Sequence, residues 1–209
     1  MPKEFTEAEP FEHNECFEEA SRLVNGEFHL EGELIPGPPE PHTVEKLQRA
    51  ATLLQRVLEI NPENGVAIYF LGRIRLRCGD NQGSLRYLLK AQEIMPLSPG
   101  TARDSIMVAM ELGQLDQALE IAKSALVRIP DDPGLLVNLG LVFLCSGRPL
   151  EAEPAFRKAS VLEPGNPLTP KLMLLSSLVA SGHRPSPQTE SEVAAATRTL
   201  PAMPTGKEF

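Results

Sequence analysis

Residues 113–130 read GQLDQALEIAKSALVRIP, and residues 147–164 read GRPLEAEPAFRKASVLEP. The two stretches align without a gap, and each begins with glycine and ends with proline. Alanine recurs in matching places, at Ala118 and Ala152 and again at Ala125 and Ala159. The fixed separation of the two stretches, from Gly113 to Gly147, is called the period below. Such a separation indicates an array of repeated structural units. The rest of the chain is therefore compared at the same spacing.

The same spacing extends beyond these two stretches. Prolines recur once in every period, at Pro62, Pro96, Pro130 and Pro164, and glycines do the same, at Gly79, Gly113 and Gly147. Glycine tolerates the left-handed conformation that ends many helices, and proline cannot continue a helix. Each period therefore predicts two helices, of which the first ends at the glycine and the second ends before the proline.

One segment conflicts locally with this pattern. Residues 70–77 (FLGRIRLR) alternate with a period of two, which by itself is typical of a strand. The repeat spacing places the same residues inside a first helix. Because the longer-range pattern rests on several independent series of residues, we predict a helix here.

In these features the chain resembles the tetratricopeptide repeat family. The best match is residues 133–166, where the family's positions are filled by Leu139-Gly140, Ala152, Phe156, Ala159 and Pro164. The family's unit is a pair of antiparallel helices, and single units bury their apolar faces by stacking. The resemblance therefore implies an all-α fold, a right-handed superhelical solenoid of antiparallel helix pairs.

The period divides the chain into consecutive units. Three full units are expected, at 65–98, 99–132 and 133–166. A split unit at 12–64, interrupted by an insertion at about 27–42, is expected before them, because helical spacing of apolar residues resumes upstream and ends at Gly26. The insertion contains Pro36, Pro38, Pro39 and Pro41 and is predicted to be a loop, although a short hairpin also fits. A degenerate unit or capping helices are expected at 167–200, with tails at 1–11 and 201–209.

Charge and composition exclude several classes of protein. The net charge is −8, and residues 1–40 hold eleven acidic side chains against two basic ones, so binding to nucleic acid by charge is disfavoured. No apolar stretch reaches the roughly 18 residues of a membrane span, and no secretory signal is visible. The three cysteines, Cys16, Cys78 and Cys145, form no motif. We expect a cytoplasmic protein that contacts neither nucleic acid nor membrane.

Catalytic and metal-binding motifs are not apparent. The histidines, His13, His29, His42 and His183, do not pair with cysteine or carboxylate at metal-ligand spacing. The sequence has neither a nucleophile motif nor a phosphate-binding glycine loop. We therefore expect no enzymatic activity, no catalytic residue, no metal and no cofactor.

The candidate site is the concave face, which the resemblance implies is lined by first helices. The repeat register turns ten candidate peptide-binding residues inward: Tyr69, Phe70, Arg73, Arg77, Arg103, Met107, Met110, Asn138, Leu141 and Lys171. The early part of this set is basic and aromatic and the later part is apolar, which favours a peptide or amphipathic helix with an acidic end. The alternative is that many of these residues are inter-helix core or are covered by the C-terminal helix.

The resemblance implies a non-enzymatic adaptor for protein–protein interaction. One alternative is a dedicated chaperone that resembles the small repeat-built chaperones of bacterial secretion systems. Another is a self-assembling scaffold, a homo-oligomer in which the acidic helix 8–24 docks on Arg73, Arg77 and Arg103 of a neighbour. Some family members bind C-terminal carboxylates through two lysines, two asparagines and an arginine; only Asn138, Arg103 and Lys171 are of the right type here, so that ligand is not expected.

Overall fold

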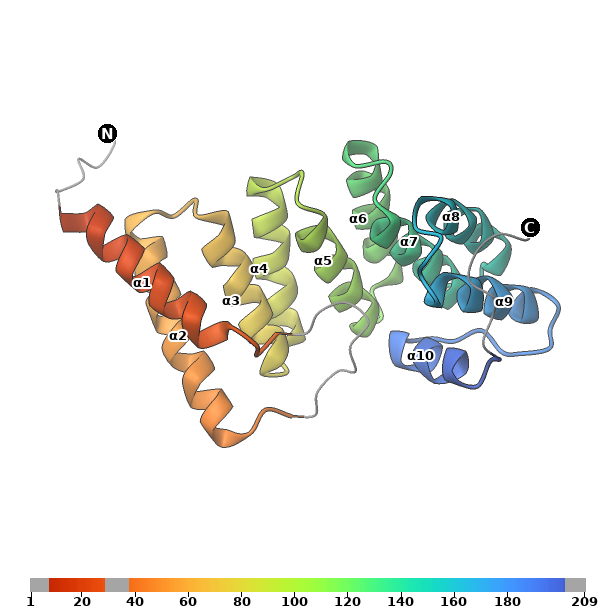
Figure 1. Cartoon of the computed structure of the whole chain (residues 1–209), viewed down its shortest axis with the longest axis horizontal. Coiled ribbons are helices and arrows are strands. Elements are labelled where there is room, and N and C mark those ends of the chain that lie inside the picture. Colours follow the sequence, from red (N-terminus) through yellow and green to blue (C-terminus); the bar gives the residue numbers. More distant parts are fainter. Residues whose placement is uncertain (1–7, 29–37, 202–209) are drawn as a thin grey trace. The chain divides into compact units, whose positions relative to one another are not determined.

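The structure is a computed structural model that describes residues 8–28 and 38–201. Within these residues the chain forms ten α-helices and no strand (Figure 1). The chain divides into two compact bodies, Met1–Met95 and Pro96–Phe209, which are described separately as the N-terminal body and the C-terminal body. In both bodies, successive helices pack in pairs, which confirms the expected all-α solenoid of helical repeats.

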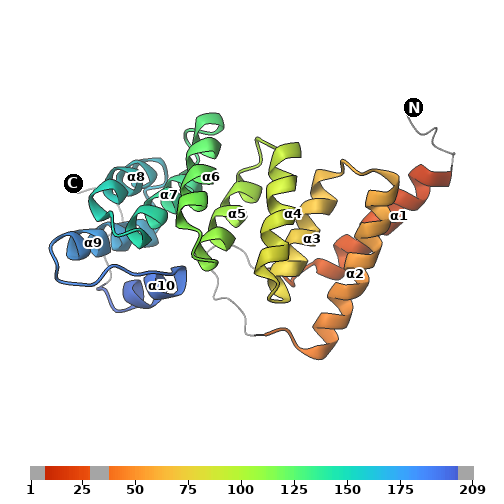
Figure 2. The ribbon, with the colours of Figure 1, turned by 180° about the vertical axis from the view of Figure 1, so that it is seen from behind.

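The N-terminal body contains two helix pairs. α1 (Ala8–Val24) packs on α2 (Pro41–Ile60), α3 (Gly65–Arg77) packs on α4 (Asn81–Ile94), and α2 joins the pairs by packing on α3 (Figure 2). Residues 70–77 lie inside α3, so the strand-like alternation of that segment is overridden by the repeat. The core is built from small and branched apolar side chains of α1, α2 and α3: Ala20, Val24, Leu47, Ala50, Leu54, Val57, Ala67, Leu71 and Ile74.

Up to residue 201, the C-terminal body forms six helices: α5 (Pro99–Glu111), α6 (Leu115–Arg128), α7 (Pro133–Cys145), α8 (Pro149–Leu162), α9 (Leu168–Ala180) and α10 (Glu190–Arg198). α5 pairs with α6 and α7 pairs with α8, while α6 packs on α7 and α8 packs on α9. The first helices α5 and α7 also contact each other. The surface that α5, α7 and α9 form is called the first-helix face below.

The helix ends follow the glycine series. Gly79, Gly113 and Gly147 have φ angles of 82°, 71° and 70°, and each follows the end of a first helix. The amide of the next residue then bonds back into the helix; Asp80 N donates to Arg75 O at 2.9 Å. Gly26 and Gly182 adopt the same conformation, with φ of 78° and 74°. The left-handed helix ends predicted from the glycine spacing are therefore present, and they also mark α1 and α9 as first helices.

The two helices on either side of the insertion extend beyond the expected unit boundary at residue 12 and into the expected insertion at 27–42. α1 already includes Ala8, and α2 begins at Pro41, which occupies a first-turn position where its missing N–H costs nothing. The predicted loop falls mainly on residues 29–37, which lie outside the described residues. α1 and the turn that follows it are joined to α2 by ion pairs: Glu12–Arg56 at 2.7 Å, Glu27–Lys46 at 2.7 Å, and Glu19–Arg49.

α10 departs from the repeat. It packs loosely on α9 and reaches α5, and in Figure 1 it lies on the side of α9 away from α8. The sequence explains why it cannot serve as a regular second helix. One period after Phe156, which packs into the core, stands Glu190, and Pro185 and Pro187 interrupt the stretch where a second helix would start. Glu190 therefore cannot supply the ring that Phe156 supplies between α7 and α8.

Candidate functional site

In the N-terminal body, three of the predicted residues form one stripe on α3. Tyr69, Arg73 and Arg77 follow one another at four-residue intervals and are half-buried. The Arg73 guanidinium carbon lies 5.8 Å from the centre of the Tyr69 ring and 4.8 Å from that of Phe28. Arg73 also donates to the Tyr69 hydroxyl at 3.4 Å. The stripe thus presents a cation held against two aromatic rings.

The fourth residue of this group, Phe70, has a packing role. Its ring stacks on Phe17 of α1 with the centroids 6.1 Å apart, and its centroid lies 6.0 Å from that of Phe28. Phe17 and Phe28 were not among the predicted site residues. Phe17 belongs to the apolar stripe of α1, and the position of Phe28, two residues after the Gly26 helix end, is the only sequence signal that could have placed it beside a first helix.

In the C-terminal body, several predicted residues connect α5 to α7. Arg103 Nη1 lies 3.8 Å from Asp132 Oδ1, and Asn138 Nδ2 donates to the Arg103 carbonyl at 3.5 Å. Met110 and Leu141 are only 1% and 7% exposed. Side chains buried to this degree cannot reach a ligand without rearrangement, so Met110, Asn138 and Leu141 occupy inter-helix core. The remaining two residues of the set, Met107 and Lys171, are half-buried.

The first-helix face of the C-terminal body is partly covered by the chain itself. α10 packs against α5 and α9, and the turn before it is anchored where Ser186 Oγ donates to Leu144 O of α7 at 2.5 Å. Thr189 caps α10 by accepting from Glu192 N at 3.2 Å. Arg184 Nη1 donates to Thr199 Oγ1 at 3.0 Å, which ties the turn to the far end of α10.

Acidic groups accumulate where α10 meets α5. Burial, and to a lesser extent the Glu111 carboxylate, raise the pKa of Glu190. The Glu190 Oε2 atom is buried and has no hydrogen-bond partner within the described residues. Burial also raises the pKa of Glu111, and burial together with Glu190, Glu192 and Glu111 raises the pKa of the Cys145 thiol to about 12. This junction therefore disfavours negative charge.

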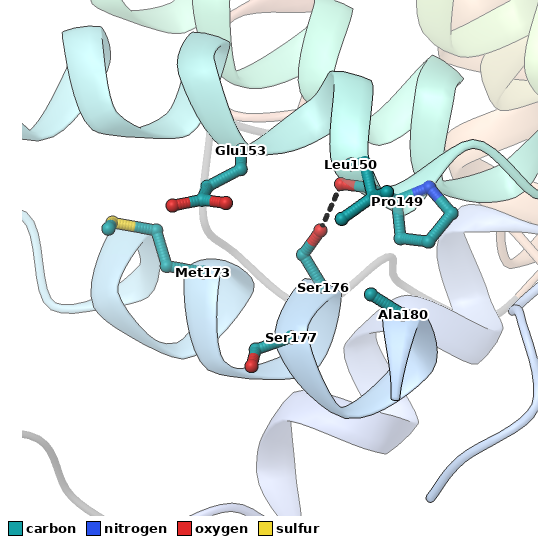
Figure 3. A pocket seen from close by; sticks show the side chains of 7 residues that line it. All are labelled: Pro149, Leu150, Glu153, Met173, Ser176, Ser177 and Ala180. Atoms are coloured by element: carbon teal, nitrogen blue, oxygen red, sulfur yellow. Dashed lines mark hydrogen bonds between the residues drawn. The ribbon is translucent and has the colours of Figure 1, made fainter. Parts of the chain in front are cut away.

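A pocket of about 250 Å³ lies between α8 and α9 (Figure 3). Its lining is contributed by both helices: Pro149, Leu150, Glu153, Met173, Ser176, Ser177 and Ala180. Ser176 Oγ donates to the Pro149 carbonyl at 2.7 Å, and the Glu153 and Met173 side chains lie at the same end of the pocket (Figure 3).

The repeat explains the chemistry of this pocket. Leu119, Val142 and Phe143, which are buried, stand one period before Glu153, Ser176 and Ser177. Polar side chains thus replace apolar ones at the interface between α8 and α9. The pocket is a polar gap in this interface.

The described residues offer little for catalysis. They contain no group of three or more histidine, cysteine, aspartate or glutamate side chains able to hold a metal ion. Burial raises the pKa values of Cys16 and Cys78 as well as that of Cys145, so these thiols are not activated as nucleophiles. None of the described helices has both the length and the apolar character to cross a bilayer.

Known proteins share this architecture. A sequence model of the tetratricopeptide repeat family matches residues 104–167. Among curated proteins, none matches the sequence significantly. The solved structure of MamA, residues 41 to the end, from Desulfovibrio magneticus RS-1 superposes with a TM-score of 0.65 at 15% identity, covering 90% of this chain and 96% of that one.

Two further solved structures are similar. Pseudomonas aeruginosa PilF gives a TM-score of 0.64 at 14% identity and covers 97% of this chain and 80% of its own. TTC0263 is a thermophilic tetratricopeptide repeat protein from Thermus thermophilus. Its structure gives a TM-score of 0.56 at 18% identity and covers 90% of this chain and 97% of its own. At these identities the likeness shows the fold alone. The match places tetratricopeptide repeats at residues 104–167, and the described helix pairs share the fold of these solved structures.

Proposed function

We propose that this chain is a non-enzymatic adaptor that binds a peptide or an amphipathic helix of a partner protein along the face of its first helices. The observation that carries the proposal is the stripe on α3, where the Arg73 guanidinium lies over the rings of Phe28 and Tyr69. A guanidinium oriented by two rings is suited to bind a carboxylate on a partner, and aromatic and arginine side chains dominate protein interfaces. The three free cysteines fit a cytoplasmic protein.

The experiment is a quantitative pull-down from cell extract with the full chain as bait. Arg73→Glu reverses the charge of the stripe, and Arg86→Glu, at an exposed position of α4 in the same body, is the matched control. The proposal expects a stoichiometric partner that is retained by the wild type and by Arg86→Glu and is lost with Arg73→Glu. A partner profile that is the same for all three proteins would contradict it.

The self-assembling alternative receives less support. In that reading, the acidic helix 8–24 docks on a neighbouring copy. Glu12 and Glu19 of α1 already pair with Arg56 and Arg49 of α2 within the same body. Docking on another copy would have to break these pairs, so we favour an adaptor that binds a different protein.

A further inference from the structure

The buried side of α10 and of the turn that follows it is a single narrow stripe. Val193, Thr197 and Leu200 follow at intervals of four and three residues and are 4%, 5% and 8% exposed. The helix has nine residues, and helices of this length are not stable alone in water. α10 therefore depends on the first-helix face for its structure, and that face accepts a short amphipathic helix.

The N-terminal end of the same stripe carries a negative charge in surroundings that are themselves negative. Glu190 lies three residues before Val193 and so on the same side of the helix. α10 contacts α5, whose last residue is Glu111, and the buried Glu190 Oε2 atom has no hydrogen-bond partner within the described residues. Burial and the Glu111 carboxylate raise the pKa of Glu190, and burial and both carboxylates raise the pKa of Cys145 at the C-terminal end of α7. The C-terminal ends of helices carry partial negative charge, so both the side chains and the backbone at this junction favour a cation. No cation contributes to the environment of Glu190 among the described residues.

We propose that the first-helix face of the C-terminal body is a helix-binding site, that α10 is its exchangeable internal occupant, and that the external ligand is an amphipathic helix of a partner protein with Lys or Arg where α10 has Glu190. This inference rests on the proposed function and narrows it. The ligand of this face is helical, and the end that meets Glu111 is basic. The acid in α10 weakens the internal complex enough for a matched helix to replace it.

The first test measures peptide binding to the full chain by fluorescence anisotropy. The probes are two synthetic peptides of residues 187–200, one with the natural sequence and one with the Glu190→Lys change. Val193→Asp in the full chain places a charge in the buried stripe and releases α10 from the face. Ala195→Asp, at an exposed position of the same helix, is the matched control.

The Lys peptide is expected to bind the Val193→Asp chain about tenfold or more tightly than the natural peptide does, because it pairs with Glu111. It is expected to bind the wild type and Ala195→Asp more weakly, because α10 competes. Adding Glu111→Lys to Val193→Asp should reverse the preference between the peptides. Equal affinities of the two peptides, or a preference that Glu111→Lys leaves unchanged, would overturn the proposal.

A second readout follows the release of α10 directly. Cys145 is 2% exposed beside this helix, so in a Cys16→Ser, Cys78→Ser background its rate of thiol labelling reports opening of the face. Val193→Asp should speed labelling, and the Lys peptide should slow it again. If Val193→Asp fails to fold, as judged by circular dichroism, Leu200→Asp replaces it. Loss of peptide binding with retention of the Arg73-dependent partner would end this inference and leave the proposed function intact.

Discussion

Gly140 and Phe156 face each other so closely that the ring of Phe156 occupies the space of a side chain at residue 140. A methyl group on Gly140 would place its carbon 2.7 Å from Cδ1 of that ring. Phe156 is fully buried, so the ring cannot move aside without disturbing the core. The contact joins α7 to α8 and shows why this unit pairs a glycine with an aromatic residue at these two positions.

We expect Gly140→Ala to lower the free energy of unfolding by about 1–3 kcal/mol, because overpacking outweighs the better helix propensity of alanine. Urea denaturation followed by circular dichroism measures the change. Gly72→Ala is the graded comparison, since its new carbon would lie 3.0 Å from the flexible Leu88 side chain. A Gly140→Ala variant as stable as the wild type would show that α7 and α8 can separate freely.

The glycines in the left-handed backbone conformation give a second prediction, which concerns backbone strain. Gly113 has a φ angle of 71° and has open space around its α-carbon, so Gly113→Ala tests backbone strain without a steric clash. The expected loss is about 1 kcal/mol of unfolding free energy. Gly165→Ala is the control, because that residue also has open space but no positive φ. Equal effects of the two substitutions would refute the strain argument.

The ion pairs between α1 and α2 should respond to salt. Arg56 donates to Glu12 at 2.7 Å and to Glu59 at 2.6 Å, and this hydrogen bonding lowers the pKa of Glu12. All three side chains are substantially exposed, so Arg56→Ala should lower the thermal midpoint only slightly at low ionic strength. The difference from the wild type should disappear in about 1 M salt, where charges are screened within a few ångströms. A deficit that persists in high salt would indicate lost packing instead.

The buried carboxylate of α10 predicts a pH dependence. Burial and Glu111 raise the pKa of Glu190 above its unfolded value of 4.5, so its contribution to stability is fully present below that value and is lost as the pH rises through the folded-state pKa. Glu190→Gln should therefore raise the thermal midpoint at pH 7 and have little effect near pH 4. Glu93→Gln, on the exposed side of α4, is the control. A lower midpoint for Glu190→Gln at pH 7 would contradict the argument.

The regular spacing of glycine in the sequence predicted where the helices of each repeat end. Gly79, Gly113 and Gly147 end helices because a left-handed residue is needed there, and this requirement is local to the backbone. The division into surface groove and core was less accessible. Met110 and Leu141 belong to an apolar pattern that a ligand-binding groove would also show. Their burial depends on neighbours that come from elsewhere in the chain.

Two positions of the last repeat carry polar residues where the preceding repeat has aromatic ones. Glu190 stands in the position of Phe156, and Ser177 in that of Phe143, each one period later. Both substitutions are visible in the sequence, and together they indicate that α10 cannot complete a regular pair. Where α10 packs instead is a tertiary effect, set by α5 and α9, and no local pattern encodes it.

The polar gap between α8 and α9 has a consequence for how such proteins change length. Each helix pair offers the next one a surface, and here that surface is interrupted by Glu153, Ser176 and Ser177. The chain that follows also carries Pro185 and Pro187 where a further second helix would start. Side chains and backbone therefore both oppose a further regular pair, and a longer array would need changes in both.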